Sequence, residues 1–285
     1  MRWRSRDGLN LYACEYQPAF ASASATPVLC LPGLTRNSRD FDVLAPWLAG
    51  LGRRVLALDL RGRGNSDRDL DRRHYQIPVY ADDVAGLLDH LSIPRAILLG
   101  TSLGGLVTMT FAVRHPKRIA GAVLNDIGPS IDPAGAARIR SYAGKVPPVT
   151  DWNSAAAYTK LINGAALPYY TDNDWDAMAR RLFREDARGR PVLDYDPQVM
   201  VPLGPVRMRI AQWLAWISFR RLTRGRSVLL LRGALSDILA PATVERMRRA
   251  APSLQYAEIP GVGHAPMLSE PEALEALRGF FEEVS

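Results

Sequence analysis

The sequence predicts an α/β fold in which a mostly parallel, doubly wound sheet is interrupted by a helical insertion. Short apolar runs alternate with amphipathic segments over residues 1–128 and 226–285, which is typical of a parallel sheet covered by helices on both faces. Residues 129–225 break this rhythm, because helical segments separated by prolines dominate there and only 191–195 resembles a strand. We therefore expect a core made of the two outer parts, with a helical cap (lid) between them.

The individual elements follow from local patterns. Asp7-Gly8 separates two strand-like runs and predicts an opening hairpin. Continuous apolar runs predict the later strands at 27–31, 54–60, 96–99, 119–124, 227–231 and 254–259. Amphipathic patterns predict core helices at 39–51, 79–91, 103–115, 243–251 and 271–283, and cap helices at 133–143, 154–162, 175–185 and 207–222. Ligands of such sheets bind beyond the carboxyl ends of the strands, so functional residues are expected there.

The strongest functional signal is the pentapeptide Gly100-Thr101-Ser102-Leu103-Gly104, which separates a predicted strand from a predicted helix. In that context G-x-S-x-G indicates a sharp turn that lifts the Ser102 hydroxyl above the sheet. Gly100 and Gly104 leave room for the turn because they have no Cβ. The amino terminus of the following helix directs free N–H groups at the point where a negative oxygen would form. Ser102 is therefore the predicted nucleophile, and the Leu103 N–H a predicted oxyanion donor.

A serine hydroxyl needs a base and an acid that orients the base. His264 lies in the glycine-rich loop 261–266 after the last predicted strand, where it can reach over the sheet, and is the predicted base. The acid should lie between the serine and the histidine in the chain, which favours Asp237 after the strand at 227–231. Asp126, directly after the strand that follows Ser102, is the alternative. A structural role is expected for the remaining histidines, His74, His90 and His115.

Together these motifs resemble the α/β-hydrolase fold superfamily. The resemblance covers P-G-L at 32–34, D-L-R-G-R-G-N-S at 59–66, G-T-S-L-G-G at 100–105, S-D at 236–237 and G-H at 263–264. It implies that Ser102 attacks an acyl carbonyl, that His264 carries the proton and that Asp237 orients the imidazole, without a cofactor. The backbone N–H of Leu34, after Gly33, is the expected second oxyanion donor. A serine nucleophile argues against the related epoxide hydrolases and haloalkane dehalogenases, which use a carboxylate.

The predicted cap is rich in tryptophan and tyrosine, which favours an apolar or aromatic small-molecule substrate. The cap also carries most of the net positive charge, so the substrate could bear a carboxylate; a solvated basic surface is the simpler interpretation. Many of these aromatic residues are expected instead to pack the cap onto the core. The candidate substrate contacts are Arg36, Tyr170, Trp213 and Trp216, with Arg39 as a further carboxylate contact.

Composition limits the other partners. The 285-residue chain has a formal net charge of +7, but its basic residues do not cluster with aromatic residues in one tract, so no nucleic-acid partner is expected. No apolar run approaches the roughly 20 residues of a membrane span, and the charged start does not resemble a secretory leader. Cys14 and Cys30 show neither disulfide nor metal spacing. We therefore expect a cytoplasmic protein without metal, cofactor or membrane partner; no oligomeric state is predicted.

The leading functional hypothesis is a serine hydrolase that cleaves a carboxylic ester or a lactone through an acyl-enzyme on Ser102. One alternative is a carbon–carbon bond hydrolase of ring-cleavage dienoates, which uses the same three residues. A second alternative, from a different class, is a small-molecule receptor with slow turnover.

Overall fold

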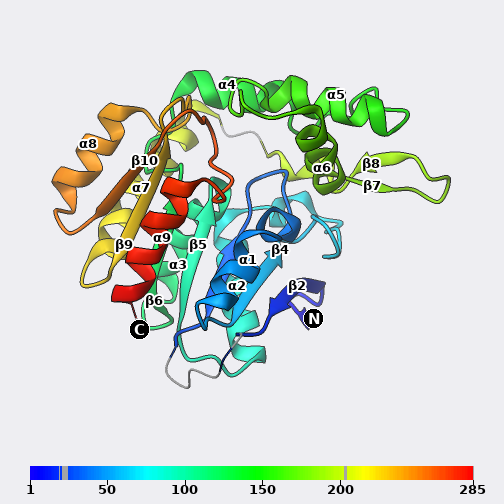
Figure 1. Cartoon of the computed structure of the whole chain (residues 1–285). Helices are drawn as coiled ribbons and strands as arrows, with labels where there is room; N and C mark the ends of the chain where they lie inside the picture. The colour runs from blue at the N-terminus through cyan, green and yellow to red at the C-terminus, as the bar shows by residue number, and fades with distance from the viewer. Residues whose placement is uncertain (19, 21–24, 202–203, 285) are drawn as a thin grey trace.

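Eight strands form one sheet with helices on both faces (Figure 1). The computed structural model describes residues 1–18, 20, 25–201 and 204–284. The strand order is β1-β2-β4-β3-β5-β6-β9-β10. The β1–β2 and β2–β4 pairs are antiparallel and the other five pairs are parallel, which confirms the predicted mostly parallel sheet. The strands are β1 (Arg2–Arg4), β2 (Asn10–Tyr16), β3 (Val28–Leu31), β4 (Val55–Asp59), β5 (Ala96–Thr101), β6 (Ile119–Asn125), β9 (Val228–Gly233) and β10 (Gln255–Ile259).

The helices divide into two layers, one on each face of the sheet. Apolar residues of α1 (Leu44–Gly50) and α9 (Pro271–Glu283) pack together on one face. On the other face, α2 (Ile77–His90) and α3 (Leu103–Arg114) share a core with α8 (Pro241–Ala250). The central strands are buried on both sides, which explains why their sequences are continuously apolar rather than alternating.

A separate group of elements lies beyond the carboxyl ends of the strands, at the top of Figure 1. We call this group the upper layer. It consists of α4 (Pro133–Tyr142), α5 (Trp152–Asn163), α6 (Asp172–Leu182) and the hairpin of β7 (Phe183–Glu185) and β8 (Pro191–Leu193). The helix predicted at 175–185 therefore ends earlier, because its last three residues pair with β8.

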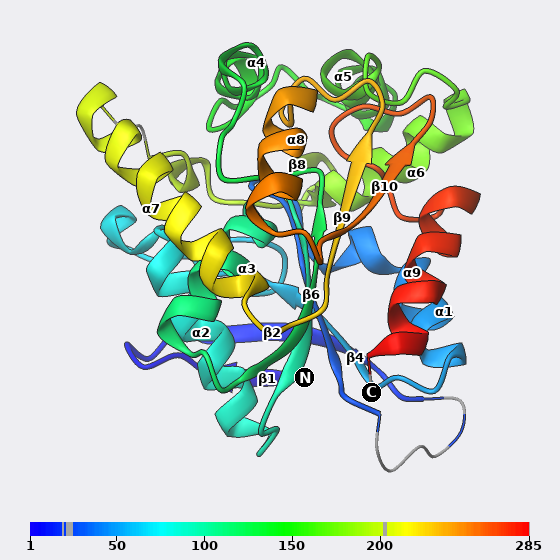
Figure 2. The same ribbon diagram turned by 90° about the vertical axis from the view of Figure 1, so that its left-hand side faces the viewer.

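The last helix of the expected cap has a different position. This helix, α7 (Pro205–Thr223), packs against α3 beside the sheet, and its residues Phe219 and Leu222 are buried in the same core as α2 and α3 (Figure 2). The segment 129–225 thus contributes both to the upper layer and to the core layer. The helical composition of this segment does not indicate which of its helices lies in the upper layer and which in the core layer.

The region after β3 also differs from the prediction. The helix expected at 39–51 is a 3-10 turn (Ser38–Phe41) followed by the shorter α1. Asn37 caps this turn, whereas the backbone N–H of Ser38 donates to the Asp59 carboxylate at 2.7 Å. Asp59 thereby ties the loop after β3 to the loop after β4, and both loops lie at the edge of the sheet where ligands bind.

Candidate active site

Ser102 lies at the junction of β5 and α3 with a backbone conformation rarely adopted by L-residues, φ +52° and ψ −113°. The turn requires two close approaches between backbone segments. A Cβ on Gly100 would come within 2.4 Å of the Gly104 carbonyl, and a Cβ on Gly104 would come within 2.1 Å of the Leu31 oxygen. Only glycine fits at these two positions, so the chain can turn sharply and present the Ser102 side chain above the sheet.

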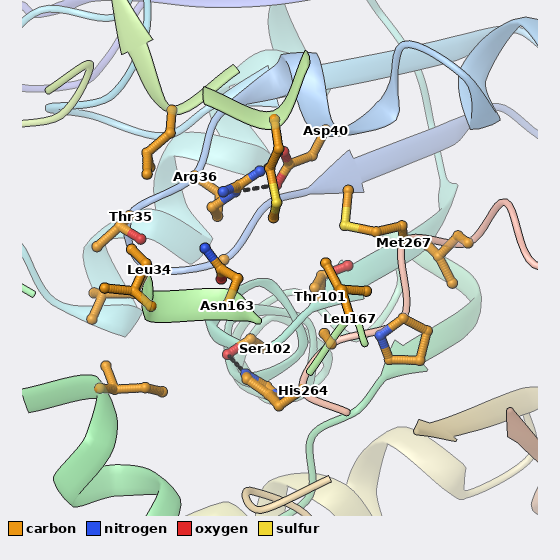
Figure 3. Close-up of a pocket in the computed structure, with 18 of the residues that line it drawn as sticks. Leu34, Thr35, Arg36, Asp40, Thr101, Ser102, Asn163, Leu167, His264 and Met267 are labelled. Atoms are coloured by element: carbon orange, nitrogen blue, oxygen red, sulfur yellow. Dashed lines mark hydrogen bonds and ion pairs between the residues drawn. The ribbon is translucent and has the colours of Figure 1, made fainter. Parts of the chain in front are cut away.

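His264 lies in the loop between β10 and α9 and faces Ser102 (Figure 3). Its Nε2 is 2.9 Å from the Ser102 Oγ, and its Nδ1 is 2.7 Å from the Oδ2 of Asp126. A carboxylate can only accept, so Nδ1 carries the hydrogen and Nε2 is left as an acceptor for the serine O–H. The three side chains therefore form one hydrogen-bonded chain in which the hydroxyl faces a base.

Asp126 follows β6 directly and is fully buried. Its Oδ1 accepts the Gly233 N–H at 3.0 Å, and its Oδ2 accepts the Ser236 hydroxyl at 2.6 Å as well as the imidazole of His264. A buried carboxylate is stable only when such donors surround it. The end of β9 and the loop after it supply the first two donors, so this segment helps to fix Asp126 in place.

The structure corrects the expectation that Asp237 orients His264. Asp237 forms a two-pronged ion pair with Arg138 of α4, with Nε–Oδ2 at 2.6 Å and Nη2–Oδ1 at 2.8 Å. This guanidinium lowers the pKa of Asp237. Within one loop, Ser236 points inward to Asp126 while its neighbour Asp237 points outward to the upper layer. The partner of His264 is therefore Asp126, which the sequence offered as the alternative to Asp237.

The two predicted oxyanion donors lie near Ser102, one at the start of α3 and one in the loop after β3. Leu103 is the first residue of α3, so its N–H has no acceptor one turn earlier in the helix. Leu34 follows Gly33, and a Cβ on Gly33 would lie 3.8 Å from the Ser102 Cβ. The buried Arg63 donates from Nε to the Leu34 carbonyl oxygen at 3.0 Å, which anchors this loop from behind.

A pocket of about 90 Å³ opens at Ser102 and His264. Core loops and the upper layer both contribute to its lining. Most of the lining is apolar and includes Leu34, Ile139, Ile162, Leu167, Met178 and Met267. Polar side chains also face it, namely Thr35, Arg36, Asp40, Thr101, Tyr142 and Asn163. The pocket therefore places an apolar wall and a few polar side chains beside Ser102 and His264, as is typical of a small-molecule site.

Of the predicted substrate contacts, Arg36 lines the pocket. Its Nε and Nη2 are held by the Asp40 carboxylate, at 2.8 and 2.5 Å, so its charge is already balanced (Figure 3). Arg39 instead pairs with Asp194, directly after β8, and is absent from the described pocket lining. It ties the loop after β3 to the upper layer.

The three predicted aromatic contacts do not belong to the described lining of the pocket. Trp213 is 64% exposed on α7. Trp216 is buried, donates to the Ser130 hydroxyl at 3.0 Å and stacks beneath Arg246. Tyr170 packs against Trp175. Sequence reasoning missed two polar lining residues that end α4 and α5, Tyr142 and Asn163; their position at helix ends in the predicted cap was the available signal.

A cluster away from the pocket, Asp7, Asp69 and His74, has ligand atoms close enough together to share a cation. Arg61 already contacts both carboxylates, at 2.7 and 2.8 Å, and pairs with a third carboxylate on Asp83. The guanidinium therefore supplies the positive charge that these acids need, and the cluster is a structural ion-pair network.

Comparison with known proteins relates the chain to hydrolases. A family model described as alpha/beta hydrolase fold matches residues 26–271. A 3-hydroxybutyrate-oligomer hydrolase from Cupriavidus necator is 32% identical, over 95% of this chain and 93% of the relative. A 2-(acetamidomethylene)succinate hydrolase from Mesorhizobium japonicum is 27% identical, over 90% of this chain and 87% of the relative. The crystal structure of an alpha/beta hydrolase from Novosphingobium aromaticivorans is 40% identical, with a TM-score of 0.89, and the match covers 100% of this chain and 98% of that one.

Proposed function

Because this chain belongs to the α/β-hydrolase fold family, we propose that it is a serine hydrolase that cleaves a carboxylic ester through an acyl-enzyme on Ser102. The observation that carries the proposal is the continuous hydrogen-bonded chain from Ser102 through His264 to the buried Asp126, at the floor of a small apolar pocket. A lactone is an internal ester and would react in the same way.

In the first half of the reaction, the Ser102 Oγ attacks the acyl carbon while its proton moves to His264 Nε2. The imidazole becomes positively charged, and the Asp126 carboxylate stabilises that charge through the hydrogen bond to Nδ1. The carbonyl oxygen becomes negative and accepts the backbone N–H groups of Leu34 and Leu103. The tetrahedral intermediate then collapses, the alcohol departs with the proton from Nε2, and the acyl group stays on Oγ.

In the second half, water takes the place of the alcohol. His264 Nε2 removes a proton from the water as the water oxygen attacks the acyl carbon. The second tetrahedral intermediate uses the same two N–H donors, and its collapse returns the proton to Ser102 and releases the carboxylic acid. We propose that the upper layer acts as a cap in both halves, since Ile139, Tyr142 and Asn163 bring it against the reacting group.

For the substrate, we propose a short acyl ester without a second carboxylate. The pocket is small, and Arg36, which would bind a carboxylate, is neutralised by Asp40. The Cupriavidus necator relative acts, by its name, on 3-hydroxybutyrate oligomers, which makes esters of short hydroxy acids the first compounds to test. The Mesorhizobium japonicum relative is named for a succinate derivative, and a substrate of that kind would require Arg36 to leave Asp40.

The proposal is tested with Ser102→Ala and a fluorophosphonate reagent that labels activated serines. Wild type should be labelled once, as measured by intact mass, and the variant should not be labelled. Turnover of a short aryl ester should fall by about a thousandfold or more in the variant, with an unchanged circular dichroism spectrum. Full turnover in the variant would exclude Ser102 as the nucleophile.

A substrate panel distinguishes the ester-hydrolase hypothesis from carbon–carbon bond cleavage and from a receptor. The panel contains a 3-hydroxybutyrate dimer, butyrate esters, lactones and a ring-cleavage dienoate. Preference for the dimer or the short esters supports the proposal, whereas preference for the dienoate favours carbon–carbon cleavage. Tight binding of a small molecule without labelling or turnover would favour a receptor.

A further inference from the structure

Helix α7 has two apolar faces, of which the fold uses one. Trp216, Phe219 and Leu222 are buried in the core shared with α3. The other face, which we call the outer stripe, consists of Val206, Ile210, Trp213, Leu214 and Ile217. These residues occur at i, i+4, i+7, i+8 and i+11, which places them on one side of a helix. Their exposed fractions are 72, 52, 64, 48 and 41%.

The outer stripe is a continuous surface rather than a scatter of single residues. In Figure 2 the amino-terminal half of α7 extends beyond the neighbouring elements, which agrees with the large exposed fractions of the stripe side chains. Large apolar side chains that line up in this way on an exposed helix indicate a binding surface. The outer stripe has no role in the proposed reaction, because none of its residues lines the pocket that the described residues form.

Along the chain, the charged residues on and next to the outer stripe are all positive. Between Asp196 and Asp237 the sequence contains seven arginines and neither aspartate nor glutamate. Five of these arginines are exposed on α7 or at its end: Arg207, Arg209, Arg220, Arg221 and Arg224. Among the ion pairs of the described residues, none involves these five. The surface therefore combines an apolar stripe with a free cationic border.

These charges decide between two kinds of partner. A second copy of the chain packed on the stripe would bring arginines against arginines, which opposes association. A surface of anionic lipids would pair with the arginines and accept the apolar side chains between its head groups. We propose that the outer stripe of α7 binds an anionic lipid surface, with the helix axis lying in the plane of the interface.

The proposed binding mode needs no membrane-spanning helix. No helix in the described part of the chain has the length and apolar character needed to cross a bilayer. A helix that lies on a surface needs only one apolar face and a basic border. The sequence-based expectation of no membrane partner rested on the absence of an apolar run long enough to span a bilayer, which does not bear on a helix that lies on the surface.

The test is flotation of the full chain with vesicles of phosphatidylglycerol or of phosphatidylcholine at low salt. We expect binding to phosphatidylglycerol to be at least about tenfold stronger. Ile210→Gln/Ile217→Gln should weaken that binding by about tenfold, because it makes the stripe polar. Leu161→Gln/Val146→Gln is the matched control, since both side chains are 80% exposed but lie outside α7, and it should bind within about twofold of wild type.

Arg220→Gln/Arg221→Gln isolates the charge and should lower both the binding and its sensitivity to salt. All variants should hydrolyse a soluble ester like wild type, which shows that they fold. The proposal is overturned if wild type does not bind, if it binds both lipids equally, or if the stripe variant binds like the control. It is also overturned if light scattering shows a dimer that only the stripe variant dissociates, because the stripe would then join two copies.

Discussion

Asp126 and Asp237 are the same residue type at nearly the same place in the fold, yet they differ in depth and partner. Each lies just after one of two neighbouring parallel strands, β6 and β9. Asp126 is fully buried and bonded to an imidazole, whereas the Asp237 side chain is 36% exposed and bonded to a guanidinium. A permanent cation occupies the second carboxylate, while the first has only donors without fixed charge beside His264. Asp126 is therefore the carboxylate that can respond when the imidazole becomes charged.

Matched substitutions of the two acids test most directly which of them orients His264. Asp126→Asn should lower kcat by about a thousandfold or more, because the imidazole loses both its orientation and the charge that stabilises it. Asp237→Asn should lower kcat by less than about tenfold, because its partner is Arg138. Both are measured with a soluble ester, and circular dichroism verifies folding. The reverse ranking would return the orienting role to Asp237.

Local sequence patterns were sufficient for the sheet, the turn at Ser102 and the position of His264. Each of these depends on residues close together in the chain: an apolar run, two glycines that flank a serine, a loop after a strand. The resemblance to the α/β-hydrolase fold drawn from these motifs is confirmed by the family match.

The choice of acid depends on contacts that no local pattern records. Asp126 and Asp237 both lie between Ser102 and His264 in the chain, so chain order does not separate them. What separates them is the direction of two adjacent side chains in the loop after β9, and an arginine 99 residues from Asp237. Side-chain direction in a loop is set by the tertiary structure, which here includes α4.

The aromatic residues of α7 illustrate the same limit. Trp213 and Trp216 are three positions apart, and composition places both in a helical cap. Trp216 is buried against Ser130 and Arg246, whereas Trp213 is exposed. The helix is apolar on two sides, so its pattern does not say which side the core covers.

Ser236→Ala removes a hydrogen-bond donor to Asp126 and leaves both acids in place, so it tests how far Asp126 depends on the loop after β9. The hydroxyl donates to Asp126 at 2.6 Å and accepts the N–H groups of Ile238 and Leu239. Its loss should lower kcat by about tenfold, because Asp126 becomes less firmly held and its charge less favourable. Ser236→Thr keeps a hydroxyl and serves as the control. An unchanged kcat in Ser236→Ala would mean that the remaining donors hold Asp126 alone.

Asp194, just after β8, is buried like Asp126 and, like Asp237, is paired with arginine. It pairs with Arg39 and Arg184, yet burial dominates and raises its pKa to about 6. A folded-state pKa above the unfolded value of 3.8 means that the folded chain binds more protons between those values. The stability contribution of Asp194 should therefore fall as pH rises from about 4 to about 6, by about 2 kcal/mol.

The measurement for Asp194 compares wild type with Asp194→Asn in denaturant unfolding at several pH values. The variant has no titrating group at this position, so the difference in free energy of unfolding isolates its contribution. We expect wild type to lose stability relative to the variant as pH rises. A relative gain would show that the arginines, rather than burial, set the pKa of Asp194.

The smallest expected effect concerns the ion pair between Arg138 and Asp237, which links α4 of the upper layer to the loop after β9. Both side chains are partly exposed, at 28 and 36%, so water screens the pair. A double-mutant cycle of Arg138→Met and Asp237→Asn should give a coupling energy of about 0.5–1 kcal/mol in denaturant unfolding. The double variant should keep nearly all of the kcat of Asp237→Asn, since the pair joins two layers and does not act on the imidazole. A much larger loss in the double variant would connect the upper layer to His264 through this pair, and the two strand-end carboxylates would then act together.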